Sequence, residues 1–335
     1  MKLRCAALLL ALGTLPLAQA RTTATEPFSF GLWGDMPYEK NADASKIPAL
    51  LASLNQSDIR FSIYDGDLKD GSSECKDSVF AEARAMFNQL RRPVVYVPGD
   101  NEWTDCHRSN NGGYSNLERL AYLRKTMFST PASFGKTTLS LEMQGSPGEK
   151  FAENTRFSHG PVVFAHFNIP GSNNNMVLDD KDCSKKSART PADCAADNAE
   201  YQERDATNIA WLKESFAKAR SQHARGIVLV FQADPGFDLP ETEDQDESKL
   251  PMYSGYRNFI SSVISETEQF DGQVLLVHGD THYFKVDKPL YSPTRLLPNL
   301  TRVETFGSPL VHWVHVSVDP KRPELFTVRP VIVKQ

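Results

Sequence analysis

Five short apolar runs, each predicted to be a buried strand, end in an acidic or amide side chain. The endings read GDMPY at 34–38, DGDLKD at 65–70, GDNEW at 99–103, QAD at 232–234 and HGDTHYF at 278–284. Longer segments with helical spacing separate most of these runs, which predicts an α/β fold. Because ligand groups gather outside the carboxyl ends of strands in such folds, we expect these side chains to meet at one site.

The remaining periodicity predicts two packed sheets with helices outside them. Apolar runs bounded by Gly, Asp or Pro indicate buried strands at 28–34, 59–64, 93–97, 162–167, 227–231 and 274–277. Helical spacing indicates helices at 77–90, 198–223 and 256–270. The C-terminal part alternates instead, which predicts antiparallel strands at 302–306, 312–318 and 325–333. Polar stretches near 105–155 and 171–200 are expected to be insertions over one end of the sheets.

Residues 1–20 have the composition of a secretory signal peptide. Lys2 and Arg4 precede a short apolar stretch that ends in the sequence AQA. This stretch is shorter than the roughly 20 apolar residues that a membrane span requires, and no later segment is long and apolar enough. We therefore expect a cleaved signal peptide, a single domain over 21–335, and a secreted or periplasmic protein without integral membrane association.

Four cysteines remain in the predicted mature chain, Cys75, Cys106, Cys183 and Cys194. In an oxidising compartment an even number of cysteines favours disulfides, and the lack of a C-x-x-C spacing argues against a structural zinc site. Four cysteines allow three pairings. We expect Cys183 with Cys194, which would close a polar insertion, and Cys75 with Cys106, which would join the loops after two strand endings.

The charge pattern and the motifs of the sequence argue against a nucleic-acid partner and against catalysis by a side-chain nucleophile. The net charge of −5 becomes −7 when the two positive charges of the signal peptide are removed. No basic stripe or Lys/Arg-rich run is present, so no nucleic-acid partner is expected. No G-x-S-x-G sequence occurs, and the mature cysteines are expected to be paired. A serine, threonine or cysteine nucleophile is therefore not indicated.

The ordered series of strand endings resembles the calcineurin-like metallophosphoesterases over nearly the whole predicted mature chain. That family has the motifs D-x-H, G-D-x-x, G-N-H-[DE], a lone His after a strand, and G-H-x-H. The corresponding sequences here are D-M-P, G-D-L-K, G-D-N-E, Gln232 and G-D-T-H. The resemblance implies a four-layer α/β/β/α sandwich of two mixed sheets that holds two metal ions. The third and last motifs also resemble the PhoD-type branch.

The resemblance, carried over motif by motif, implies one set of metal ligands. Pro37 stands at the histidine of the first motif and supplies no ligand, whereas Asp67 takes the position that bridges the two metals. The set is rich in oxygen, so it favours Mn, Mg, Ca or Fe over Zn. Asp70 is a further candidate for a metal contact. The implied ligands are Asp35, Asp67, Asp100, Gln232, Asp280 and His282.

Asn101 stands where the family has its catalytic histidine. An amide can donate a hydrogen bond to a phosphate oxygen, but it cannot supply a proton to a leaving group. His107 and Arg108 follow in the same loop and are candidates for binding the phosphate. With an ordinary pKa of about 6.5, His107 is also the candidate proton donor. Asn101 and His107 are thus the candidate catalytic residues.

The sequence predicts an exported, metal-dependent phosphoesterase that hydrolyses phosphomonoesters or phosphodiesters through a metal-activated hydroxide. Its expected partner is a phosphorylated small molecule. The alternative is a catalytically degenerate binding protein with the same fold. The acids and His282 at the strand ends favour the enzyme, whereas the replaced family histidines favour the binding protein.

Overall fold

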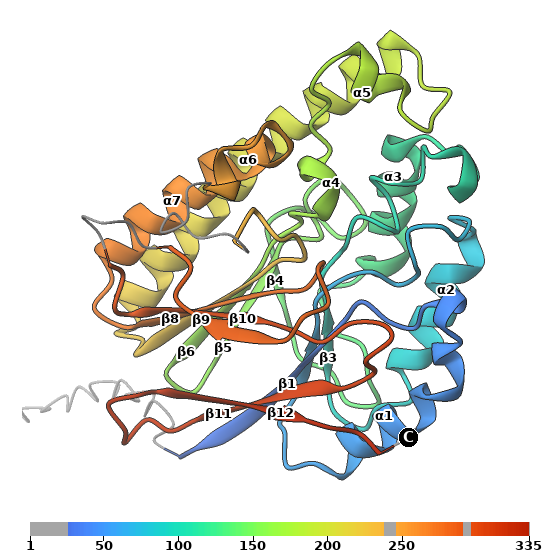
Figure 1. The fold of residues 1–335 in the computed structure, drawn as a ribbon. Helices are drawn as coiled ribbons and strands as arrows, with labels where there is room; N and C mark the ends of the chain where they lie inside the picture. Colours follow the sequence, from blue (N-terminus) through green and yellow to red (C-terminus); the bar gives the residue numbers. More distant parts are fainter. Residues whose placement is uncertain (1–25, 238–245, 291–295, 335) are drawn as a thin grey trace, which may run out of the picture.

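Two β-sheets form the centre of the protein (Figure 1). The computed structural model describes residues 26–237, 246–290 and 296–334, so the predicted signal peptide lies outside the described residues. The five-stranded sheet consists, in spatial order, of β12 (Phe326–Val331), β11 (Trp313–Val318), β1 (Phe28–Trp33), β2 (Ser62–Tyr64) and β3 (Val94–Tyr96). The seven-stranded sheet consists of β4 (Glu142–Met143), β5 (Thr155–His159), β6 (Val162–His166), β7 (Gly226–Val230), β8 (Gln273–His278), β10 (Leu300–Glu304) and β9 (Lys285–Asp287).

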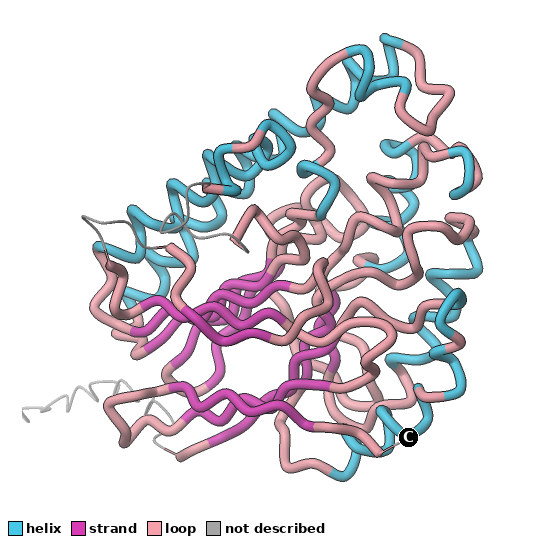
Figure 2. Tube along the Cα trace, in the orientation of Figure 1, coloured by secondary structure: helices cyan, strands magenta, loops and turns pink. Residues whose placement is uncertain are grey.

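Helices cover the outer face of each sheet, and the two inner faces pack together (Figure 2). One buried cluster joins the five-stranded sheet to α1 (Ile47–Gln56), α2 (Asp77–Phe87) and α3 (Asn116–Met127). Another joins the seven-stranded sheet to α6 (Pro191–Ser221) and α7 (Arg257–Glu268). A third lies between the sheets. The predicted four-layer α/β/β/α sandwich is confirmed. The short helices α4 (Gly171–Asn174) and α5 (Asp180–Ser184) lie near the site described below.

The strands read as continuous apolar runs because both of their faces are buried. In β7, Val228 and Val230 point between the sheets, whereas Ile227 and Leu229 point toward α6 and α7. Side chains that alternate between two apolar layers leave no polar face in the sequence. A run of this kind is expected for a parallel strand, and β7 pairs in parallel with β6 and β8.

The strand register brings the predicted ligands to one edge of the molecule. Trp33 of β1 pairs with Tyr64 of β2, and Tyr64 pairs with Tyr96 of β3, all in parallel. In the other sheet Val230 of β7 pairs with Val277 of β8, also in parallel. Within each sheet these strands therefore end at matching heights, and a hydrogen bond from Asp280 N to Asp35 joins the residues that follow them across the two sheets.

One prediction about the strands is corrected by the structure, and one predicted insertion proves to contain a helix. β11 and β12 pair antiparallel as expected, but β10 joins the other sheet and lies parallel to β8. It is inserted between β8 and the edge strand β9, an arrangement that alternation of apolar residues does not reveal. The polar stretch 105–155 also contains α3, of which Leu120 and Leu123 are part of the buried core.

Both expected cysteine pairs are disulfides. Cys75 is bonded to Cys106, and Cys183 is bonded to Cys194. The first disulfide joins the loop after β2 to the loop after β3. The second closes the segment that contains α5 on the start of α6. In the described ranges, no helix combines the length and the hydrophobicity needed to cross a membrane.

Candidate metal centre

Six side chains meet where β1, β2, β3, β7 and β8 end. Asp35, Asp67 and Asp100 follow strands of the five-stranded sheet, while Gln232, Asp280 and His282 follow strands of the other. The backbone N–H of Asp280 donates to Asp35 Oδ1 at 3.2 Å, which joins the two sheets at this edge. Gln232 Nε2 lies 3.4 Å from Asp100 Oδ1 and 3.3 Å from Asp280 Oδ1. We call Asp35, Asp67, Asp100 and Asp280 the carboxylate cluster.

In two of the G-D pairs the glycine leaves room for an aspartate of another motif. A Cβ atom on Gly99 would lie 2.1 Å from Asp67 Oδ1, and one on Gly279 would lie 2.0 Å from Asp35 Oδ2. Any larger residue would therefore displace a carboxylate of the cluster. At these two positions the G-D sequence thus has a tertiary cause: the glycine makes room for an acid of another motif, and its own aspartate joins the same cluster.

Four of the six predicted ligands have a left-handed backbone conformation. The φ angles are 50° at Asp35, 62° at Asp67, 75° at Asp280 and 66° at His282. Positive φ is uncommon in residues other than glycine and concentrates at functional sites, where the surrounding structure enforces it. Here it turns each side chain sharply from the end of its strand into the cluster.

The carboxylate cluster places several acidic side chains close together and largely away from solvent. Asp35 and Asp67 are 0% and 2% exposed, and Asp100 is 7% exposed. Burial, together with the nearby Asp100 and Asp35, raises the pKa of Asp67 well above its usual range. Burial and the nearby Asp100 do the same to the pKa of Asp280. Carboxylates in this situation are stabilised by bound cations.

Asp35, Asp67 and His282 form a group that could hold a cation. One ligand atom from each of them lies within 4.8 Å of the others. His282 Nδ1 faces the carbonyl oxygen of Ser308 at 2.7 Å, which directs Nε2 toward Asp35 at 3.4 Å. Burial disfavours protonation of this imidazole, but the hydrogen bond to Asp35 and the adjacent negative charge raise its pKa to about 9. A cation bound here would therefore displace a proton from His282.

Tyr38 lies in this group, although the sequence did not indicate it. Its hydroxyl donates to Asp67 Oδ2 at 2.9 Å and lies 3.3 Å from His282 Nε2. Burial, followed by the charges of Asp67 and Asp35, raises the pKa of the Tyr38 phenol well above its usual range. The available signal was its position one residue after Pro37, which occupies the family histidine's position. Tyr38 brings an oxygen to the place where that histidine is missing.

Gln232 connects two carboxylates by hydrogen bonds. Its Oε1 accepts from the backbone N–H of Gly171 at 2.6 Å, so its amide nitrogen faces Asp100 and Asp280. To bind a metal through oxygen, the amide would have to rotate and give up the bond to Gly171. In the observed arrangement Gln232 supports the cluster as a hydrogen-bond donor and is not placed as a ligand.

Asn101 faces the cluster and not open solvent. Its Nδ2 donates to Asp67 Oδ2 and lies 3.3 Å from the Tyr38 hydroxyl, while its backbone N–H donates to Asp67 Oδ1 at 3.1 Å. The side chain is 7% exposed. The amide of Asn101 therefore faces Asp67 and Tyr38, and an amide has no proton to give to a leaving group.

His107 and Arg108 lie in the loop after β3, next to the cluster. Arg108 forms an ion pair with Asp105, and its Nη2 donates to Ser172 Oγ at 3.1 Å. The same hydroxyl lies 2.8 Å from Asp100 Oδ2, so Ser172 connects Arg108 to the cluster. Burial, together with the charges of Arg189 and Arg108, lowers the pKa of His107 to about 3. His107 is therefore neutral at physiological pH, and the pKa of about 6.5 expected from the sequence is wrong.

Two further acids near the motifs have local structural roles. Asp70, a predicted candidate for a metal contact, instead accepts from Ser72 N at 2.9 Å and from Ser73 Oγ at 2.6 Å. Glu102 accepts from Leu68 N at 3.2 Å and Gly99 N at 2.7 Å. Glu102 thereby fixes the loops that carry Asp67 and Asp100. Sequence reasoning did not identify this role, although Glu102 occupies the acidic position of the family's third motif.

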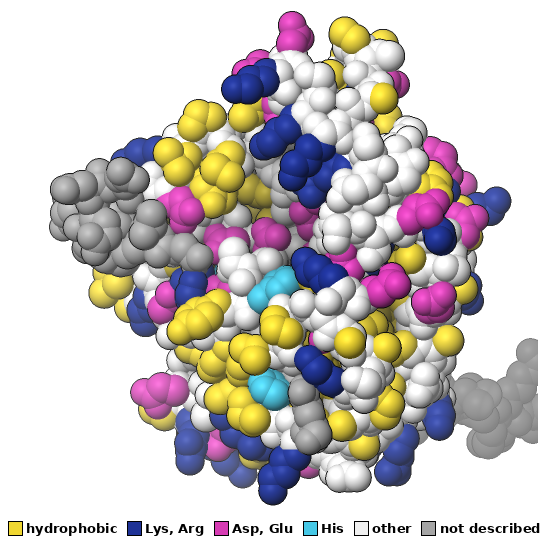
Figure 3. Space-filling view, turned by 45° about the vertical axis from the view of Figure 1, so that its right-hand side comes forward, with side chains coloured by type: hydrophobic (Ala, Val, Ile, Leu, Met, Phe, Trp, Pro, Cys, Tyr) yellow, Lys and Arg dark blue, Asp and Glu magenta, His cyan; other side chains and the backbone are white. Residues whose placement is uncertain are grey.

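A cavity of about 400 Å³ opens on the cluster at Asp100 and Asp280. Its wall includes His107 and Arg108, and it continues along the segment after α4. In Figure 3, acidic side chains are visible in a hollow of the surface, with Lys and Arg side chains on one side and hydrophobic side chains on the other. A small anionic molecule in this cavity would contact the cluster directly.

Comparisons with known proteins identify the fold. No protein-family model matches the chain, and no curated protein sequence matches it. Among solved structures, PhoD aligns with a TM-score of 0.51 at 10% identity, over 91% of this chain and 68% of PhoD. GAP50, the anchor in the inner membrane complex of Plasmodium, aligns at 0.47 and 12% identity, over 92% of this chain and 90% of GAP50. Purple acid phosphatase PPD1 from yellow lupin aligns at 0.46 and 10% identity, over 92% of this chain and 54% of PPD1.

Proposed function

We propose that this chain, which has the calcineurin-like metallophosphoesterase fold, is an exported metal-dependent phosphoric ester hydrolase. The observation that carries the proposal is the carboxylate cluster. Three buried acids, the half-buried Asp280 and His282 converge from four strand ends, and desolvation together with mutual repulsion raises the pKa of Asp67 and Asp280. An arrangement of this kind destabilises the protein unless a cation binds, and a cavity gives small anions access to it.

The side chains fit two divalent cations that share one ligand. Asp35, Asp67 and His282, with Tyr38 beside them, would hold the first. Asp67, Asp100 and Asp280 would hold the second. This oxygen-rich set favours Mn, Mg, Ca or Fe over Zn. Cations bound there would supply a hydroxide nucleophile and neutralise charge that develops on the phosphoryl oxygens.

The chain's own groups bind and orient the phosphoester. Asn101 Nδ2 would donate a hydrogen bond to a phosphoryl oxygen, in place of its bond to Asp67. The Arg108 guanidinium adds positive charge on the cavity side. Neither Asn101 nor the neutral His107 is placed as a strong proton donor. Substrates whose leaving group departs without a proton, such as aryl phosphates, are therefore expected to react faster than alkyl phosphates.

Export is part of the proposal. Two disulfides, Cys75–Cys106 and Cys183–Cys194, are typical of proteins from oxidising compartments. The composition of residues 1–20 supports a secretory signal peptide. Secreted or periplasmic localisation accounts for both features.

Metal analysis and hydrolysis assays on the purified protein test the proposal. We expect the wild-type protein to retain divalent metal and to hydrolyse p-nitrophenyl phosphate with one of Mn, Mg, Ca or Fe. The Asp67→Asn variant should lose both metal and activity. The matched control is Asp205→Asn, another buried carboxyl group, which lies on α6 and accepts from Asn258. It should keep both properties. Unchanged metal content in Asp67→Asn would contradict the proposed site.

Neither Asn101 nor the neutral His107 is placed to give a proton to a leaving group. This favours a second candidate function, that of a binding protein without catalysis. A catalytically degenerate protein would bind metal and phosphate but hydrolyse nothing. Stoichiometric metal binding, combined with no turnover of aryl phosphates with any of these metals, would establish this alternative.

A further inference from the structure

The disulfide-closed segment 183–194 forms one wall of the cavity that opens on the carboxylate cluster. Lys185, Lys186 and Arg189 of this segment line the cavity together with Arg108 of the loop after β3. These four positively charged side chains line the same cavity as Asp100 and Asp280. The cavity therefore combines an acidic end, where the cations of the proposed metal centre would bind, with a basic wall.

Among the described residues, two of these four positively charged side chains form ion pairs with acidic residues, and the other two do not. Arg108 pairs with Asp105, and Arg189 Nη1 pairs with Asp197 Oδ2 at 2.8 Å. Within the described ranges, the ammonium groups of Lys185 and Lys186 make no hydrogen bond or ion pair, and both residues are exposed. The wall therefore carries two positive charges that are available to an anion in the cavity.

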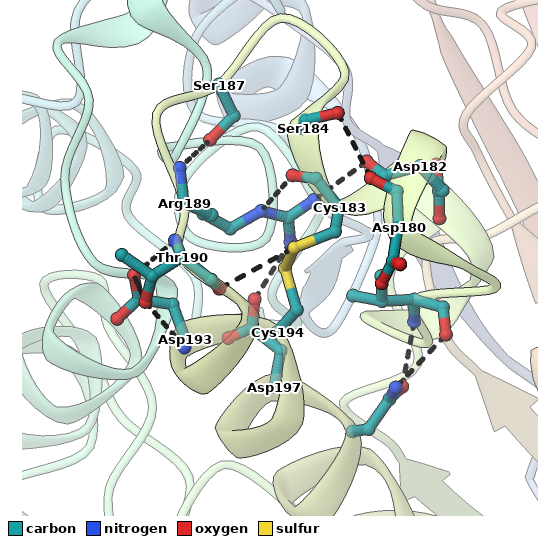
Figure 4. Close-up of a disulfide and its surroundings, with 12 residues drawn as sticks. Asp180, Asp182, Cys183, Ser184, Ser187, Arg189, Thr190, Asp193, Cys194 and Asp197 are labelled. Atoms are coloured by element: carbon teal, nitrogen blue, oxygen red, sulfur yellow. Dashed lines mark hydrogen bonds and ion pairs between the residues drawn. A yellow bond between two sulfur atoms is a disulfide. The ribbon is translucent and has the colours of Figure 1, made fainter.

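The position of this wall is fixed by covalent and polar contacts (Figure 4). The Cys183–Cys194 disulfide closes the segment, and Arg189 Nε donates to the carbonyl oxygen of Cys183 at 3.2 Å. The carbonyl oxygen of Lys186 accepts from Ser109 N at 2.8 Å, which docks the segment on the loop that carries His107 and Arg108. Lys186 also has a left-handed backbone, with φ of 57°. The two lysines are thus held beside the cavity and are not part of a free loop.

We propose that Lys185 and Lys186 form a second anion-binding subsite. The substrates of this site would then be small phosphoesters that carry a second phosphate group, with one phosphate at the carboxylate cluster and the other at the lysines. This specificity rests on the proposed hydrolase function, but the subsite itself is a binding property. A ligand with two anionic ends gains the contact at the lysines, whereas a ligand with one anionic end does not.

Two phosphonates of matched chain length test the subsite without any turnover. Propane-1,3-bisphosphonate carries two anionic ends, and propylphosphonate carries one. Isothermal titration calorimetry on the metal-loaded protein gives the dissociation constant of each. We expect the wild-type protein to bind the bisphosphonate on the order of tenfold more tightly, since two exposed ion pairs each contribute modestly. The preference should fall as ionic strength rises.

The Lys185→Ala/Lys186→Ala variant should lose this preference. Lys181→Ala is the matched control, because Lys181 belongs to the adjoining helix α5 but does not line the cavity. It should keep the wild-type ratio of dissociation constants. The Cys183→Ala/Cys194→Ala variant should lose most of the preference, because the lysines are then no longer fixed.

Equal ratios in the wild type and the double lysine variant would overturn the subsite, as would the absence of any preference in the wild type. A separate assay of p-nitrophenyl phosphate hydrolysis keeps the two proposals distinguishable. Loss of the bisphosphonate preference with intact hydrolysis contradicts the subsite alone. A lysine-dependent preference without hydrolysis supports the subsite and contradicts the hydrolase.

Discussion

Removal of the Cys75–Cys106 disulfide tests how the loops of the site are held. The bond joins the loop after β2, which carries Asp67, to the loop after β3, which carries Asp100. Both cysteines are buried, at 1% and 0% exposure, and the Cys75→Ala/Cys106→Ala variant introduces no polar atom at either position. The remaining ties across this region are hydrogen bonds, such as Cys75 N to the carbonyl oxygen of Asn111 at 2.9 Å.

The magnitude follows from the length of chain that the disulfide closes. A sequence separation of 31 residues corresponds to a loss of about 4 kcal/mol in the free energy of unfolding when the bond is removed. The Cys183–Cys194 bond closes only 11 residues and corresponds to about 3 kcal/mol. The Cys75–Cys106 variant should therefore be the less stable of the two, and it should also bind metal more weakly.

Urea unfolding of the metal-free protein, followed by circular dichroism, gives these free energies by linear extrapolation. Metal affinity is measured on the same samples by calorimetry. A loss below about 1 kcal/mol for the Cys75–Cys106 variant would refute the loop-closure reasoning. Unchanged metal affinity would show that hydrogen bonds alone, including those of Glu102, position Asp67 and Asp100.

Three other predictions concern single side chains. Burial raises the pKa of Asp70, but hydrogen bonds from Ser72 and Ser73 outweigh this effect and lower the pKa to about 2. The Asp70→Asn variant should therefore have a free energy of unfolding that is lower by about 1 to 2 kcal/mol at pH 7. Because the folded pKa lies below the unfolded value of about 3.9, urea titrations should show this difference disappearing as pH falls from about 4 to 2. Tyr38→Phe removes the hydroxyl beside Asp67 and should weaken metal binding about tenfold, measured as metal retained after dialysis. Asn101→His should raise turnover of alkyl phosphates more than that of aryl phosphates, and equal changes in the two rates would exclude proton donation at this position.

Much of the fold was predictable because a strand that is buried on both faces has a continuous apolar sequence. A strand such as β7, with Ile227 and Leu229 facing helices and Val228 and Val230 facing the other sheet, is apolar throughout. The G-D endings marked where such strands stop, and the order of motifs along the chain indicated the family fold. The even cysteine count predicted disulfides but left three pairings open, and the expected pairing is the one present. These features are visible in residue type, spacing and order alone.

The details of the site depended on distances between segments that the sequence does not contain. The neutral His107 results from burial and two nearby arginines, one of which, Arg189, lies in the segment before α6. The orientation of Gln232 is set by the backbone N–H of Gly171, and the role of Tyr38 by its approach to Asp67 and His282. Charge, desolvation and hydrogen-bond direction vary over a few ångströms, whereas a motif fixes only residue type and order. The sequence by itself therefore determined which acids meet at the strand ends, and the tertiary structure decided which atoms of their neighbours point toward them.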